Sequence, residues 1–171
     1  AELEERMMEW LRDMTGLPSS FEGVIQDSAS SATLAALITA RERVTGYASN
    51  SKGLNDAGRL RIYASTQAHS SVEKGAGVAG FGRENVVRIA VRKDYSIDTD
   101  ALAKAIEADL SAGYIPCCVV ATLGTTGTTA IDDLRAVGAL CREKNIFLHV
   151  DAALGGTALL LPEMRWMAEG I

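Results

Sequence analysis

Short apolar runs alternate along the chain with segments in which apolar residues recur every three or four positions. Runs with the length and branched composition of buried strands fall at 60–64, 86–91, 115–122 and 145–151. Helical spacing follows between them, at 98–110 and 132–144. Strands that alternate with helices predict right-handed crossovers and a largely parallel sheet covered on both faces, so the fold class is α/β.

The first third of the chain predicts helices and loops. Apolar residues at helical spacing, Leu3, Met7, Trp10 and Leu11, precede a break at Gly16 to Pro18. A second helix is predicted over 32–43, a loop rich in Gly, Asn and Ser over 46–58, and a further helix from 70–74 onward. Because the first helix begins at the first residue, we expect the chain to be part of a longer protein.

Composition narrows the function classes. The chain has 171 residues, of which 47% are hydrophobic, so it can bury one substantial core. Its net charge is −5 and it has no run of Lys or Arg, which argues against nucleic acid or an anionic membrane as the main partner. Without a signal peptide or a membrane-spanning apolar stretch, a cytoplasmic location is expected.

The three cysteines predict neither a disulfide framework nor a metal site. Cys117 and Cys118 are adjacent in an apolar run, where strand alternation predicts side chains on opposite faces, and Cys141 stands alone. We interpret all three as buried structural thiols.

Asp151 ends the apolar run 145–151 and is followed by small residues. A carboxylate at the carboxyl end of a parallel strand lies where open α/β sheets bind ligands. Near a core it requires a cation or hydrogen-bond donors, and the protonated ring nitrogen of pyridoxal phosphate (PLP) would satisfy it. The alternative is that Asp151 only caps the next helix.

A second candidate lies before the helix predicted over 32–43. The segment Gln26 to Ser31 places small hydroxyl residues at the helix start, where unpaired backbone N–H groups carry partial positive charge. This arrangement predicts a phosphate site. Ordinary N-capping by Asp27 or Ser28 is the simpler alternative.

His69 comes where the strand 60–64 gives way to the next helix, so it faces the same rim as Asp151 if the strands are parallel. It is suited to stack on a flat ring, although a surface or capping role is the alternative. The glycine pattern of 75–80 resembles a dinucleotide-binding loop, but it lies inside a helical segment and predicts close helix packing or a helix end instead. The turns that carry Ser28 to Ser30, His69, Thr125 to Thr128 and Asp151 are therefore predicted to converge on one cleft.

Four segments in order resemble motifs of the PLP-dependent aromatic amino-acid decarboxylases. They are Gly23–Ser30, Tyr63–Lys74, Val120–Thr126 and Leu148–Ala153. The resemblance implies a three-layer α-β-α large domain of fold type I, like that of aspartate aminotransferase, with a mostly parallel sheet. Residues 1–171 would form the central part of this PLP-binding domain, in an enzyme that acts as a homodimer.

The resemblance also assigns roles to residues. Ala29 and Ser30 would hold the cofactor phosphate, His69 would stack on the ring, and Thr126 would contact the ring substituents. Asp151 would pair with the pyridinium nitrogen, and Ala153 would pack beneath the ring. His69 and Asp151 are the predicted catalytic residues, and no metal is implied.

The sequence departs from the family pattern in two respects. Leu154 stands where an aromatic residue is frequent, and Gly155 to Thr157 replace Ala-Gly-Ser. The family's Schiff-base lysine lies in an Asn-Pro-His-Lys motif downstream of the aspartate, and this sequence does not contain that motif. Its five lysines all precede Asp151 and are predicted to be solvated surface residues, namely Lys52, Lys74, Lys93, Lys104 and Lys144.

The resemblance therefore implies PLP-dependent decarboxylation of an L-amino acid, most readily an aromatic one, to an amine and CO2, with the 171-residue chain inactive by itself. Two alternatives stay open. One is another fold-type I enzyme, such as a glutamate-type decarboxylase, an aminotransferase or a lyase. The other is a non-catalytic α/β domain that binds a phosphate ligand.

Overall fold

Four parallel strands form the centre of the computed structural model, which describes residues 2–55 and 57–171. They lie in the order β2-β1-β3-β4, and each neighbouring pair is parallel. Their bounds are Arg59–Ser65 for β1, Val86–Ile89 for β2, Tyr114–Thr122 for β3 and Phe147–Asp151 for β4. The predicted parallel sheet is confirmed.

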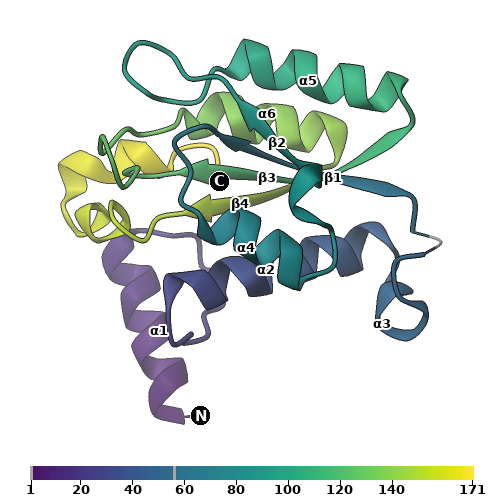
Figure 1. Cartoon of the computed structure of the whole chain (residues 1–171). Coiled ribbons are helices and arrows are strands. Elements are labelled where there is room, and N and C mark those ends of the chain that lie inside the picture. The colour runs from purple at the N-terminus through teal and green to yellow at the C-terminus, as the bar shows by residue number, and fades with distance from the viewer. Residues whose placement is uncertain (1, 56) are drawn as a thin grey trace.

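Helices cover both faces of this sheet (Figure 1). On one face lie α2 (Ala29–Val44) and α4 (Ser71–Val78), and on the other α5 (Thr99–Ser111) and α6 (Leu134–Lys144). Each face buries its own apolar cluster, since strand side chains alternate between the two layers. The three-layer α-β-α architecture is therefore confirmed.

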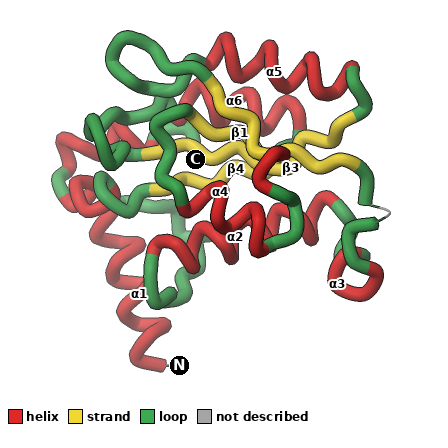
Figure 2. Tube along the Cα trace, in the orientation of Figure 1, coloured by secondary structure: helices red, strands yellow, loops and turns green. Residues whose placement is uncertain are grey.

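The order of the strands places a topological switch between β1 and β3. The chain leaves β1 through α4 toward β2, then crosses through α5 to β3 and continues through α6 to β4. Connections that diverge from two adjacent strands open a crevice at their carboxyl ends. Figure 2 shows the loops that follow the strands gathered at this edge.

Several predicted boundaries shift. The strand predicted over 86–91 ends at Ile89, and the predicted loop 46–58 contains one helical turn, α3 (Ser49–Lys52). Short 3-10 helices lie before β2, at Arg83–Asn85, and after β4, at Gly156–Leu160 and Pro162–Ala168. The glycine pattern 75–80 lies in and after α4, where Gly75 packs against Leu37 of α2, so the predicted packing role is confirmed.

Two predictions about strand side chains are wrong. The run 145–151 was expected to be buried, but every residue of β4 is half-buried because β4 has only one neighbouring strand among the described residues. Cys117 and Cys118 were expected on opposite faces, but both pack in the cluster beneath α2 and α4. A bulge opposite Arg61 and Ile62 skips Cys117 in the register and removes the alternation.

All three cysteines are buried and free, as predicted. Burial raises the pKa of Cys117 and of Cys141 to about 12, and it raises the pKa of Cys118 well above its ordinary value. These thiols are therefore protonated and unreactive at neutral pH.

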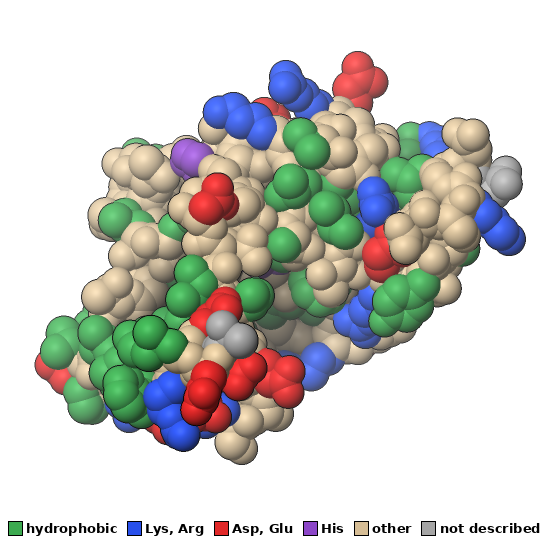
Figure 3. Space-filling view, turned by 90° about the horizontal axis from the view of Figure 1, so that it is seen from below, with side chains coloured by type: hydrophobic (Ala, Val, Ile, Leu, Met, Phe, Trp, Pro, Cys, Tyr) green, Lys and Arg blue, Asp and Glu red, His purple; other side chains and the backbone are tan. Residues whose placement is uncertain are grey.

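The N-terminal helix α1 (Glu2–Thr15) projects from the body and leaves its apolar residues uncovered. Leu3 is 75% exposed and Trp10 is 53% exposed. Seen from below, hydrophobic side chains gather on the lobe where α1 lies (Figure 3). No helix among the described residues is both long enough and apolar enough to span a membrane.

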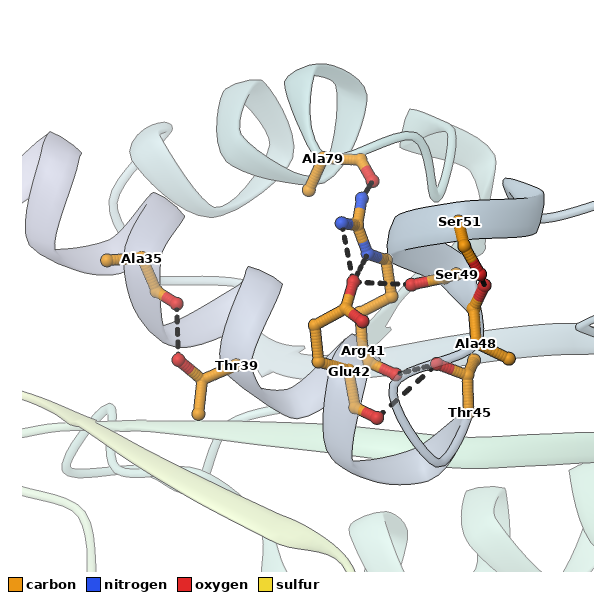
Figure 4. Close-up of polar contacts among 9 residues, drawn as sticks. All are labelled: Ala35, Thr39, Arg41, Glu42, Thr45, Ala48, Ser49, Ser51 and Ala79. Atoms are coloured by element: carbon orange, nitrogen blue, oxygen red, sulfur yellow. Dashed lines mark hydrogen bonds and ion pairs between the residues drawn. The ribbon is translucent and has the colours of Figure 1, made fainter.

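A partly buried polar cluster fixes α2 against α4 (Figure 4). Arg41 on α2 donates to the carbonyl of Ala79 at 2.6 Å and to the carboxylate of Glu42 at 2.8 Å. Ser49 donates to the same carboxylate oxygen at 2.5 Å. The bond to Ala79 ties together the carboxyl ends of α2 and α4, whose amino ends lie at the crevice.

Candidate functional site

A cavity of about 240 Å³ opens at the carboxyl ends of the strands. Its lining comes from α2 and from the segments after β1, β3 and β4, and consists of Ala29, His69, Thr122, Gly124, Thr126, Asp151, Ala153 and Leu154. Five of the six predicted site residues line it. The sixth, Ser30, is the next residue of α2 and does not line the cavity itself.

Asp151 is the last residue of β4 and is half-buried. Its Oδ1 accepts a hydrogen bond from the backbone N–H of Ala153 at 3.1 Å, which closes a local turn. The next helical segment, Gly156–Leu160, begins after Gly155 and has no side-chain cap, so the prediction that Asp151 caps it is wrong. In residues 2–55 and 57–171, no cationic side chain forms an ion pair with this carboxylate. The carboxylate is therefore available to a cationic ligand in the cavity.

The amino end of α2 combines a cap with two free donors. Ser28 accepts from the N–H of Ser31 at 3.2 Å and Ser31 accepts from the N–H of Ser28, which forms a capping box and confirms the capping alternative. The N–H of Ala32 bonds to the carbonyl of Ser28. Within the part of the chain that the structure describes, the N–H groups of Ala29 and Ser30 are the helix donors left over, and an anion at this position would accept from them.

His69 is exposed and lines the cavity while also binding the start of α4. The N–H of Ser71 donates to Nδ1 at 3.2 Å, and the Ser71 hydroxyl lies 3.0 Å from the same atom. An accepting Nδ1 places the ring hydrogen on Nε2 in this network. The capping alternative is thus correct for Nδ1, which accepts a hydrogen bond at the start of α4. This bond fixes the orientation of the imidazole ring that lines the cavity.

The loop after β3 is held closed by its own threonines. The hydroxyls of Thr125 and Thr128 lie 2.7 Å apart, and Thr125 also accepts from the N–H of Ala130 at 3.0 Å. This leaves Thr126 exposed at the cavity wall.

The loops after β3 and β4 approach each other closely. The backbone N–H of Gly155 donates to the carbonyl of Leu123 at 2.9 Å, and a Cβ at Gly155 would lie 2.5 Å from that carbonyl oxygen. The two loops therefore touch backbone to backbone.

Three lining residues were not among the predicted site residues, namely Thr122, Gly124 and Leu154. Thr122 is the last residue of β3 and the register partner of Asp151. Thr122 is 4% exposed, and its hydroxyl has no hydrogen-bond partner among the described residues. Its position at a strand end was visible in the sequence, but its place beside Asp151 depends on the strand order.

A larger apolar cavity of about 780 Å³ runs along the free edge of β4. Its lining comes mainly from β4, α6 and α2, with further residues from the segment after α1 and from the C-terminal end, and none of the predicted site residues lines it. Its size alone does not make it a chemical site. The smaller cavity contains the ionisable and donor groups that a reaction requires.

Comparisons with known proteins agree with this geometry. A sequence profile described as "Pyridoxal-dependent decarboxylase conserved domain" matches residues 1–171. The chain belongs to the pyridoxal-dependent decarboxylase family.

Within this family, the chain is 45% identical to aromatic-L-amino-acid decarboxylase of Sus scrofa, over 99% of this chain and 37% of that protein. It is 42% identical to histidine decarboxylase of Rattus norvegicus, over 99% of this chain and 27% of that protein. The structure of Oryza sativa TDC with PLP and tryptamine aligns with a TM-score of 0.91 at 36% identity, over 99% of this chain and 36% of that chain. The chain thus spans about a third of the length of these relatives, and the predicted family resemblance is confirmed.

The lining suits PLP, the cofactor of this family. The free N–H groups of Ala29 and Ser30 match a phosphate, the unpaired carboxylate of Asp151 matches a protonated ring nitrogen, and the fixed imidazole of His69 matches a flat ring. Ala153 is small enough to let a ring approach. The donor set therefore fits the cofactor.

None of the five lysines lines the cavity. Lys52, Lys74, Lys93 and Lys104 are exposed, as predicted. Lys144 is half-buried and forms ion pairs with Glu107 at 2.5 Å and Glu143 at 3.2 Å, so its prediction as a solvated residue is only partly correct. These pairs raise the pKa of Lys144 and keep it charged.

Proposed function

We propose that this chain is the central part of the cofactor domain of an amino-acid decarboxylase that converts an aromatic L-amino acid to its amine and CO2. The observation that carries the proposal is the carboxylate of Asp151, unpaired with any described cation, in a cavity that it shares with a helix amino end and a fixed histidine. A phosphate donor set and a carboxylate that line the same small cavity suit a phosphorylated heterocycle with a basic nitrogen.

PLP, when bound, supplies an electron sink that accepts the electron pair released as a carboxylate leaves as CO2. The contributions of the chain itself are positional and electrostatic. Asp151 holds the ring nitrogen protonated, because a neighbouring negative charge raises the proton affinity of that nitrogen. The N–H groups of Ala29 and Ser30 hold the phosphate at the partial positive charge of α2.

His69 contributes orientation. The bond from Ser71 fixes the imidazole plane, so the ring is available as a rigid wall over one side of the cavity. The reaction that an amino-acid substrate undergoes depends on which of its bonds stands perpendicular to the cofactor ring. A rigid aromatic wall near the substrate carboxylate favours loss of CO2 over transfer of the amino group.

The substrate class rests on the relatives, whose names include aromatic-L-amino-acid and histidine decarboxylases. Leu154 is 55% exposed at the cavity mouth and is the side chain there that differs from the frequent aromatic residue. Assembly as a homodimer is part of the proposal, and the uncovered apolar residues of α1 support it.

The test is a substrate panel. The protein is expressed from its complete reading frame, loaded with PLP, and incubated separately with L-tryptophan, L-tyrosine, L-DOPA, L-histidine and L-glutamate, with CO2 and amine measured. We expect amine and CO2 in equal amounts from an aromatic substrate, and about 100-fold to 1,000-fold slower product formation by the Asp151→Asn variant. A 2-oxo acid as the main product would identify an aminotransferase, and PLP binding without any turnover would identify a non-catalytic domain.

The complete reading frame offers a simpler check. An Asn-Pro-His-Lys motif downstream of residue 171 would provide the lysine that the described cavity does not receive from the chain. Borohydride treatment of the PLP-loaded 171-residue chain should then give no adduct at a unique lysine, as mass spectrometry would show. An adduct fixed selectively at one of the five lysines, such as Lys74, would contradict their assignment to the surface.

A further inference from the structure

Thr122 carries a buried hydroxyl that the fold itself does not use. Among the described residues, four buried side-chain polar atoms have no hydrogen-bond partner, and Thr122 Oγ1 is the one that belongs to a lining residue of the cavity. The backbone of Thr122 is fully engaged, since its N–H donates to Asp132 at 2.7 Å and its carbonyl accepts from Asp132 at 3.0 Å. An unpaired buried hydroxyl is costly, so its presence requires an explanation.

The sheet places this hydroxyl beside Asp151. Thr122 and Asp151 are register partners in the parallel pair β3 and β4. Val120 and Phe147 pack in the cluster beneath α2 and α4, and strand alternation puts Thr122 and Asp151 on that same face. Neighbouring strands lie about 4.8 Å apart, which brings a hydroxyl within reach of a carboxylate through rotation about χ1.

The Oδ2 atom of Asp151 can accept a hydrogen bond. Its Oδ1 accepts from Ala153, and no donor in the described part of the chain bonds to Oδ2. The hydroxyl of Thr125 is occupied, because it already bonds to Thr128 and Ala130, and Thr126 is exposed at the cavity wall rather than buried beside Asp151. The unpaired Nε2 of His149 is on the same face, but the register partner of His149 is Val120 and His149 does not line this cavity.

We propose that Thr122 is a positioning residue for Asp151, whose hydroxyl donates to the carboxylate when the cavity holds PLP and thereby fixes the carboxylate toward the ring nitrogen. The proposal rests on the proposed function, because it assumes that Asp151 pairs with this nitrogen. A hydroxyl is suited to the task, since it orients the carboxylate without adding a positive charge that would compete with the ring for it.

The proposal is tested by PLP affinity, measured by equilibrium dialysis on the protein from its complete reading frame. Thr122→Val removes the hydroxyl at nearly constant shape, and Thr122→Ser restores a hydroxyl. Thr15→Val is the matched control, because Thr15 is a buried threonine at the end of α1 that bonds only to carbonyls of its own helix. The melting temperature of each variant is measured without PLP.

We expect Thr122→Val to weaken PLP binding about tenfold, as loss of a hydrogen bond to a charged group does. Its melting temperature without PLP should be unchanged or higher, because the hydroxyl has no partner in the described ligand-free chain. Thr122→Ser should bind PLP nearly as wild type does, and Thr15→Val should change stability rather than affinity. If Thr122→Val does not fold, Thr122→Ala removes the same hydroxyl and replaces it in the test.

A double-mutant cycle decides whether Thr122 acts through Asp151. In the Asp151→Asn background, Thr122→Val should change PLP affinity by much less than in wild type. Additive effects, wild-type affinity in Thr122→Val, or equal loss in Thr122→Ser would each overturn the proposal. If wild type itself does not bind PLP, the proposed function fails, whereas wild-type binding with an unaffected Thr122→Val rejects this inference alone.

Discussion

Two aspartates flank Thr122 and differ in what surrounds them. Asp132 accepts from the N–H of Thr122 and from the N–H of Ile97, both at 2.7 Å, and is 2% exposed. Asp151 lies beside Thr122 on the next strand, accepts one N–H bond from Ala153, and opens into the cavity. The first carboxylate is satisfied inside the protein and the second is not.

This difference in hydrogen bonding distinguishes a carboxylate that stabilises the fold from one that can bind a ligand. The two oxygens of Asp132 join the end of β3 to the segment before α5, so its contacts are complete without a ligand. Burial raises the pKa of Asp132, opposed by the hydrogen bonds from Ile97 and Thr122. Asp151 remains half-buried with capacity for a cation, which is the condition a cofactor-binding carboxylate must meet.

The largest predicted effect is at Asp151. Asp151→Asn should lower decarboxylation by about 100-fold to 1,000-fold, because the lost charge acts most strongly on the transition state. Its melting temperature without PLP should stay close to that of wild type. Steady-state kinetics and a thermal melt test the two parts, and near wild-type turnover would remove the assigned role of Asp151.

Asp132→Asn should show the opposite pattern. The amide keeps one acceptor but turns an NH2 group toward the second backbone N–H, which should cost about 1–3 kcal/mol of stability. Urea unfolding measures this loss. PLP affinity should be retained because Asp132 does not line the cavity, and a variant that is stable but no longer binds PLP would show that the two aspartates are not separable.

His69→Gln tests a second ionisable residue of the same cavity lining. Gln retains a polar side chain but loses the flat ring, so turnover should fall about tenfold while PLP affinity falls less, because alignment contributes mainly to the rate. The product ratio should shift toward 2-oxo acid. Unchanged turnover and unchanged products would leave His69 with only its bond to Ser71 at the start of α4.

The smallest effect is the pH dependence of stability that comes from Asp132. Its pKa is higher in the folded protein than the ordinary value of about 3.9, so the folded state binds the proton more tightly than the unfolded state does. Its stabilising contribution is therefore greatest at low pH and is lost as the pH rises from about 4 through the raised pKa. The stability advantage of wild type over Asp132→Asn should decline across that range in urea titrations, and an advantage that grows with pH would contradict the assigned direction.

Much of the fold followed from local pattern. Apolar runs and helical spacing predicted all four strands and the main helices, because burial imposes periods of two and 3.6 residues on a sequence. The rim residues followed from the same logic, since the carboxyl ends of parallel strands share one edge. Ala29, His69, Thr126, Asp151 and Ala153 were therefore brought together as predicted.

Other features depended on neighbours that are distant in sequence. The bulge at Cys117 arises from pairing between β1 and β3, and the exposure of β4 arises from its place at the edge of the described sheet. Alternation within one strand specifies neither, because each depends on what lies beside the strand.

The sequence by itself determined which segments form strands, which residues stand at strand ends, and the family motifs that point to PLP. Only the tertiary structure decided that His69 both binds the start of α4 and faces the cavity. It also decided that both oxygens of Asp132 accept from backbone N–H groups, whereas Asp151 accepts one such bond. The register of β3 and β4 places Thr122 beside Asp151. The physical reason is that periodicity records whether a residue is buried, whereas the partner of a polar atom is set by strand order and register, which join residues far apart in the chain.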